Sequence, residues 1–274
     1  MSRLYSISLL THASLTPPEQ VMMAKRLGYD GIGVRIAPAT PGGICAPLIK
    51  DKALLAETLR RMDETGIPVF DIEMIRLNAD FNPADWTGFL ETAAALRAKA
   101  ILVAADDPDE ARLTASFARL CEAARPYNLT CDLEFMPWTE VKDGKSALRV
   151  VTAANQPNAR ILPDSLHIDR SRTSLDDLRA IPRHMLGYGQ ICDAPAGIPA
   201  TYEEMIFTAR CARLQPGEGG IDLAAMFAAL PADLPISIEV PHDERLPKVG
   251  QEEWARQCLA TSKALMAEAD ALRA

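Results

Sequence analysis

Short apolar segments alternate with longer amphipathic segments along the whole chain. The short segments are rich in aliphatic and β-branched residues and are bounded by Gly, Pro and Asp, a pattern that predicts buried strands. Eight segments fit this description: Leu4–Leu10, Gly31–Ile36, Pro68–Ile75, Ala100–Ala104, Thr130–Phe135, Ala159–Pro163, Met185–Cys192 and Pro235–Val240.

A predicted helix follows each strand. The first begins at Thr16, where Glu19 has the spacing of a capping box, and ends at Gly28. The others are Asp51–Thr65, Pro83–Ala98, Asp107 to about Pro126, Lys145–Ala154, a short helix from Ser174, Asp222–Leu230 and Gln251–Leu272, with Tyr202–Arg210 as a further candidate inside the loop 193–220. Alternating strands and helices predict a parallel sheet. Eight repeats in 274 residues favour a single (β/α)₈ TIM barrel over residues 1–274.

Composition and charge narrow the function. The chain has 29 Lys and Arg against 37 Asp and Glu, a formal charge of −8, which disfavours nucleic-acid binding because that needs a basic face. No apolar run approaches the roughly 20 residues that span a membrane, and the first residues do not resemble a signal peptide. The 6 cysteines form no CxxC pair, as is typical of reduced thiols. We therefore expect a cytoplasmic protein with a small-molecule substrate and neither nucleic-acid nor membrane partners.

Oxygen-bearing side chains fall near the carboxyl ends of the last four predicted strands. They are Glu134, Asp164, Gln190 and Glu239. Reacting groups of such barrels lie at this end, and three carboxylates that converge there repel one another unless they are protonated or neutralised. An all-oxygen set suits Mg²⁺ or Mn²⁺ better than zinc. The sequence therefore predicts one divalent metal ion held by these four residues.

Three further polar residues have positions that face the same mouth. Arg35 ends the second predicted strand, Glu73 lies late in the third, and His12 lies just beyond the first. We predict that all three contact the substrate.

Several segments resemble the sugar phosphate isomerase/epimerase family of xylose isomerase-like TIM barrels. They are LEFMPW, PDSLHIDRS, GQICDAP, ARLQPGEGGIDL, ISIEVP and the opening TPPEQVMMAKRLGYDGIGVR. The resemblance covers nearly the whole chain and is specific for the superfamily rather than for a substrate. It implies one divalent metal on a Glu, an Asp, a His or Gln, and a Glu, which match the four residues above. His is the commonest third ligand in the family. Gln190 at this position resembles instead the arrangement of bacterial 3-dehydroshikimate dehydratases, in which Gln is the third ligand.

The resemblance also implies roles for individual residues. The DxxH spacing places His167 beside the substrate, where it can bind an oxygen or move a proton. Arg213 matches the Arg of an Arg-x-x-Pro-Gly-x-Gly loop and would bind a carboxylate, phosphate or hydroxyls. In an isomerase or epimerase, Glu134 and Glu239 would be the acid/base pair. In a dehydratase, His167 would be the better base or acid.

The expected function is a divalent-metal-dependent isomerase or epimerase. It would abstract a proton next to the carbonyl of a sugar, sugar phosphate or similar polyhydroxylated compound, through a metal-stabilised enediolate. The alternative is a lyase of the 3-dehydroshikimate dehydratase type. A metal-dependent endonuclease is disfavoured by the net charge and the 4 histidines, and a non-catalytic binding barrel by the intact carboxylates. Family members often form dimers or tetramers, so a homo-oligomer is an open expectation.

Overall fold

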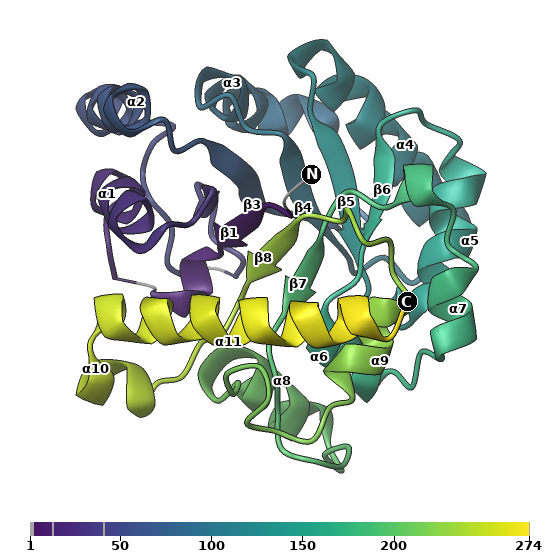
Figure 1. Ribbon diagram of the computed structural model, residues 1–274. Helices are drawn as coiled ribbons and strands as arrows, with labels where there is room; N and C mark the ends of the chain where they lie inside the picture. Colours follow the sequence, from purple (N-terminus) through teal and green to yellow (C-terminus); the bar gives the residue numbers. More distant parts are fainter. Residues whose placement is uncertain (1–2, 13, 41, 274) are drawn as a thin grey trace.

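Eight parallel strands form the centre of the molecule (Figure 1). The computed structural model describes residues 3–12, 14–40 and 42–273. The strands are β1 Tyr5–Ile7, β2 Gly31–Arg35, β3 Val69–Leu77, β4 Ala100–Ala105, β5 Thr130–Glu134, β6 Ala159–Leu162, β7 Gly189–Ile191 and β8 Ile236–Ile238. Sequence neighbours pair from β1 to β6, β7 pairs with β8, and β8 pairs with β1, which gives the order β6-β5-β4-β3-β2-β1-β8-β7.

Two isolated bridges span the remaining gap between β6 and β7. They join Ile161 to Leu186 and Asp164 to Gln190. The sheet is therefore a nearly closed barrel, and the predicted single (β/α)₈ TIM barrel is confirmed. The second bridge also places two predicted metal ligands side by side.

Helices surround the barrel on its outer face (Figure 1). They are α1 Pro17–Leu27, α2 Lys52–Thr65, α3 Thr87–Ala95, α4 Glu110–Ala124, α5 Gly144–Ala154, α6 Ser165–Arg170, α7 Leu175–Arg179, α8 Tyr202–Cys211, α9 Leu223–Ala228, α10 Arg245–Val249 and α11 Gln251–Ala271. The predicted capping box begins α1, where the Thr16 backbone N–H donates to Glu19 Oε2 at 2.8 Å. None of the described helices is long and apolar enough to cross a membrane.

Side chains of β4 alternate between two apolar layers. Ile101 and Val103 belong to the large core between the strands and the helices, together with Phe117 of α4. Leu102 and Ala104 belong to a smaller cluster, which also contains Tyr188. Because successive side chains of a strand point to opposite faces, this second cluster fills the interior of the barrel.

The same alternation turns polar residues toward the barrel axis. In β5, Cys131 and Leu133 pack in the outer core, so Asp132 and Glu134 face inward. In β7, Ile191 packs outward, which leaves Gln190 on the inner face. The alternation of side chains thus turns Glu134 and Gln190 toward the barrel axis, near the carboxyl ends of their strands.

The boundaries of several predicted elements change. The strand predicted over 4–10 ends at Ile7 because a 3₁₀ turn, Leu9–Thr11, follows it, and the strand predicted over 185–192 shortens because the 3₁₀ turn Arg183–Met185 occupies its start. The helix predicted over 83–98 begins as a 3₁₀ turn at Pro83–Trp86. The sequence pattern does not predict the two short helices α6 and α10, whereas the candidate helix Tyr202–Arg210 is confirmed as α8.

The described cysteines form no disulfide. Four are buried, whereas Cys45 and Cys211 are half-buried. The cytoplasmic location inferred from them stays a prediction.

Candidate active site

One side of the site is built where β5 and β6 end. Glu134 is the last residue of β5, and Asp164 follows β6 and caps α6. Asp164 Oδ1 accepts the backbone N–H groups of Leu166 at 2.7 Å and His167 at 3.3 Å. This cap begins α6 directly at the mouth of the barrel, so His167 stands beside the carboxylates.

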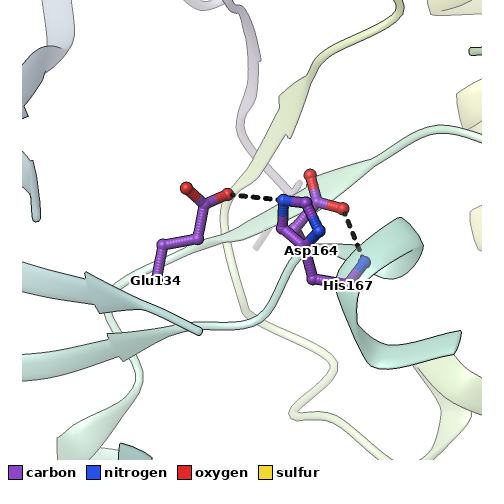
Figure 2. Close-up of side chains that lie close together, drawn as sticks. All are labelled: Glu134, Asp164 and His167. Carbon is purple, nitrogen blue, oxygen red and sulfur yellow. Dashed lines mark hydrogen bonds and ion pairs between the residues drawn. The ribbon is translucent and has the colours of Figure 1, made fainter. Parts of the chain in front are cut away.

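Figure 2 shows the resulting group of three side chains. His167 Nε2 lies 3.5 Å from Glu134 Oε1. One potential ligand atom from each of Glu134, Asp164 and His167 lies within 4.8 Å of the other two, and all three residues are buried. The structure thus adds His167 to two of the predicted metal ligands.

The other side of the site comes from β7 and β8. Gln190 Nε2 donates to Glu239 Oε1 at 3.3 Å. Gln190 Oε1 is buried and has no hydrogen-bond partner among the described residues. A buried carbonyl oxygen without a partner is costly, and a bound ligand would satisfy it.

Ser8 connects this side to β3. Its hydroxyl lies 2.8 Å from Glu239 Oε1 and 3.0 Å from Glu73 Oε1. A hydroxyl has one proton, so it can donate to only one of these carboxylates at a time. Glu73 Oε2 accepts from Arg35 Nη2 at 2.5 Å, which links β2 and β3 to the same network.

Arg213 links the two sides. Its Nη1 lies 2.6 Å from Asp164 Oδ2 and its Nη2 lies 2.7 Å from Glu239 Oε2. Its Nε donates to the backbone carbonyl of Ala209 at 2.8 Å. The guanidinium therefore bridges two of the four predicted metal ligands, which lie 75 residues apart in sequence.

The loop that follows Arg213 is held by one carboxylate. Asp193 Oδ2 accepts the backbone N–H groups of Gly217 at 3.0 Å and Gly219 at 2.9 Å. Its Oδ1 accepts those of Ala194 at 2.8 Å and Ile221 at 3.2 Å. Asp193 thus holds the backbone of the segment that resembles the Arg-x-x-Pro-Gly-x-Gly loop.

A cavity of about 180 Å³ opens at this end of the barrel. Its polar lining includes six of the predicted site residues: Arg35, Glu73, Glu134, His167, Arg213 and Glu239. Leu102, Met136 and Trp138 supply an apolar wall, and the Trp138 ring packs edge-on against His167 with centroids 5.0 Å apart. The volume is below the roughly 300–1,000 Å³ of sites for drug-sized ligands, which favours a small substrate.

His12 is placed differently from the other predicted substrate-binding residues. It is fully buried, and neither ring nitrogen has a hydrogen-bond partner among the described residues. Burial lowers its pKa to about 3. It is not among the described residues that line the cavity, and its substrate-binding role stays a prediction.

Burial and mutual repulsion shift the acids of the site. Burial, together with the charges of Asp164 and Glu239, raises the pKa of Glu134 well above its usual range. Burial also raises the pKa of Glu239 to about 7, although the Arg213 guanidinium opposes the shift. Both effects follow from the cost of a charged carboxylate in a dry, acidic site.

Asp164 and His167 respond differently. Burial acts to raise the pKa of Asp164, but Arg213 and His167 outweigh it, and the pKa is lowered. Burial lowers the pKa of His167 to about 4, so the imidazole is neutral at pH 7. A neutral imidazole can accept a proton or bind a metal ion.

Comparison with protein families matches residues 21–265 to the xylose isomerase-like TIM barrel family. The chain belongs to this family. Comparison with curated protein sequences returned no match. Solved structures show the same fold at low identity, and three of them are informative.

The zinc-bound IolI protein has a TM-score of 0.79 and 18% identity, over 96% of this chain and 98% of that chain. A xylose isomerase domain-containing protein from Salmonella typhimurium LT2 has a TM-score of 0.78 and 14% identity, over 97% and 99%. D-psicose 3-epimerase in the presence of D-fructose has a TM-score of 0.71 and 16% identity, over 96% and 99%.

The residues of this xylose isomerase-like barrel fit a divalent metal ion. Glu134, Asp164 and His167 offer close donor atoms, and Gln190 offers the unpartnered amide oxygen. Carboxylate and amide oxygens are hard donors, while the imidazole widens the choice to metals such as zinc.

The sequence pattern does not predict two of the contacts within the site. Ser8 touches both Glu73 and Glu239, and the alternation of Ser6 and Ser8 on a predicted strand is the signal that marks it as inward-facing. The double ion pair of Arg213 had no local signal, because it depends on how a long loop returns to the barrel.

Proposed function

We propose that this protein is a divalent-metal-dependent isomerase or epimerase of a small polyhydroxylated carbonyl compound. The main support is that Glu134, the last residue of β5, and Glu239, the first residue after β8, both line one small cavity at the carboxyl end of the barrel. A pair of carboxylates that reach one substrate from different strands can remove and return a proton at the carbon next to a carbonyl. The solved epimerase of similar fold is consistent with this chemistry.

The proposed metal ligands are Glu134, Asp164, Gln190 and Glu239, with His167 as a further donor or as a substrate contact. A bound divalent ion, Mn²⁺ or Mg²⁺ for the all-oxygen set, supplies positive charge that stabilises negative charge developing on the substrate carbonyl oxygen. Glu134 and Glu239 hold and move the proton.

The remaining polar residues bind and orient the substrate. The half-buried Arg35 and the buried Glu73 form an ion pair at the cavity wall, where both can hydrogen-bond to hydroxyl groups. Trp138 and Met136 exclude water from one side of the cavity. His12 is fully buried, and a contact with the substrate remains its proposed role.

Deuterium incorporation tests the proposal across a whole class of candidate substrates at once. Purified protein with Mn²⁺ is incubated in D₂O with a panel of ketoses, aldoses and their phosphates, and carbon-bound deuterium is measured by mass spectrometry. We expect incorporation into at least one compound, and its loss in Glu134→Gln and Glu239→Gln. Glu268→Gln, an exposed position on α11, is the matched control and should retain activity. Incorporation at the wild-type rate in either site variant would contradict the assignment.

A dehydratase is the second candidate, and Gln190 together with His167 favours it. His167 is neutral at pH 7, and its Nε2 faces Glu134 at 3.5 Å, so it can serve as a base in the cavity. Incubation with 3-dehydroshikimate and Mn²⁺ should then produce an aromatic absorbance, and His167→Asn should abolish it. Absence of product at high enzyme concentration removes this candidate.

A further inference from the structure

Both oxygens of the Asp164 carboxylate and both oxygens of the Glu239 carboxylate have partners within this chain. Asp164 Oδ1 accepts two backbone N–H groups of α6, and its Oδ2 accepts from Arg213 at 2.6 Å. Glu239 Oε1 accepts from Ser8 at 2.8 Å and from Gln190 at 3.3 Å, and its Oε2 pairs with Arg213 at 2.7 Å. Every oxygen of these two carboxylates therefore already has a partner.

The guanidinium occupies the position between the two carboxylates. A divalent ion of the Mg²⁺ type binds oxygen at about 2.0–2.1 Å, closer than the guanidinium nitrogens lie. An ion bound by Asp164 Oδ2 and Glu239 Oε2, the two oxygens that pair with Arg213, would therefore have to enter the space that the guanidinium fills. Two cations in one buried site also repel each other strongly, because the low local dielectric screens them little.

The Arg213 side chain is held in place by the surrounding structure. It is 2% exposed, and its Nε is anchored on the carbonyl of Ala209 at 2.8 Å. The bridge between Leu214 and Asp193 fixes the next residue of the chain. The double ion pair is therefore a built feature of the loop that follows α8.

We propose that the Arg213 guanidinium and a divalent cation are alternative occupants of the position between Asp164 and Glu239. Metal uptake by both carboxylates then requires the guanidinium to move away, and Arg213 lowers the affinity of the site for metal. The proposal rests on the metal site of the proposed function. A displaced guanidinium remains beside the cavity that it lines, where it can bind a hydroxyl or anionic group of the substrate.

Direct Mn²⁺ binding tests this exclusion without any activity assay. Metal-stripped wild type, Arg213→Met and Arg213→Lys are titrated with Mn²⁺, and free Mn²⁺ is measured by electron paramagnetic resonance. We expect Arg213→Met to bind Mn²⁺ at least tenfold more tightly than wild type. Arg149→Met, which removes an exposed ion pair with Glu110, is the matched control and should bind like wild type.

Arg213→Lys keeps the test decisive if the Met variant does not fold, which circular dichroism would show. A lysine ammonium cannot bridge two carboxylates as a planar fork does, so this variant should bind Mn²⁺ at least threefold more tightly than wild type. Equal or weaker binding in the folded variants overturns the exclusion. If wild type binds Mn²⁺ tightly in that case, the proposed function stands. If no form binds Mn²⁺, both proposals fail.

Discussion

The Asp193 carboxylate gives a sharp prediction about stability. Each of its oxygens accepts two backbone N–H groups, from Gly217 and Gly219 on one side and from Ala194 and Ile221 on the other. In Asp193→Asn one oxygen becomes an NH₂ group, which cannot accept and faces two donors. The substitution keeps the shape of the side chain and removes half of its acceptors.

The magnitude follows from the number of bonds lost. Hydrogen bonds to a charged group contribute about 1.5–3 kcal/mol each, so two of them predict a loss of about 3–6 kcal/mol in the free energy of unfolding. A typical domain has about 5–15 kcal/mol in total, so the variant should fold but unfold at much lower denaturant. Urea unfolding followed by circular dichroism measures the difference.

Asp222→Asn is the matched control for this prediction. Asp222 caps α9 through a single bond from the Ala225 N–H at 3.2 Å, and Asn serves as well as Asp at such a cap. We expect no measurable change there. A loss below about 1 kcal/mol in Asp193→Asn would refute the claim that this carboxylate holds the loop.

Three further predictions follow from the inner face of the barrel. Glu134→Gln and Glu239→Gln should each reduce turnover by at least about a thousandfold, measured as deuterium incorporation, while circular dichroism stays unchanged. Burial raises the pKa of Asp71, so the native state binds more protons than the unfolded chain, and the free energy of unfolding should fall as the pH rises above about 4. The variant Asp71→Asn should therefore be more stable than wild type at pH 8 and equal to it at pH 4. Urea unfolding measures this difference, and an identical pH profile for the two proteins would contradict the prediction. A Cβ at Gly187 would lie 1.8 Å from Asp132 Oδ1, so Gly187→Ala should lower the free energy of unfolding by about 1–3 kcal/mol, and a wild-type urea midpoint would count against the packing.

The sequence predicts the fold well because the barrel repeats one simple pattern. Apolar runs such as Ala100–Ala104 are buried on both faces, and cap and glycine signals such as Thr16 and Gly28 mark helix ends locally. The errors occur where tertiary structure decides. Helix α6 has only one turn and a half, which is too short for a periodic pattern, and it exists because Asp164 caps it at the mouth of the barrel.

The candidate site is predictable to the same extent. Strand-end positions identify Glu134, Asp164, Gln190 and Glu239, because the alternation in each strand and the common direction of the strands place them at one mouth. The contacts between them are not predictable in this way. The ion pairs of Arg213 depend on the path of the loop 193–220, which no local pattern encodes.

The position of a bound metal ion tests the central claim most directly. Crystals of the wild-type protein soaked in Mn²⁺ would be measured for anomalous scattering. We expect one strong peak between Glu134, Asp164, Gln190 and Glu239, about 2.0–2.3 Å from their oxygen atoms, with Arg213 displaced. A structure at saturating Mn²⁺ with no peak among these residues, or with the peak elsewhere in the protein, would contradict it.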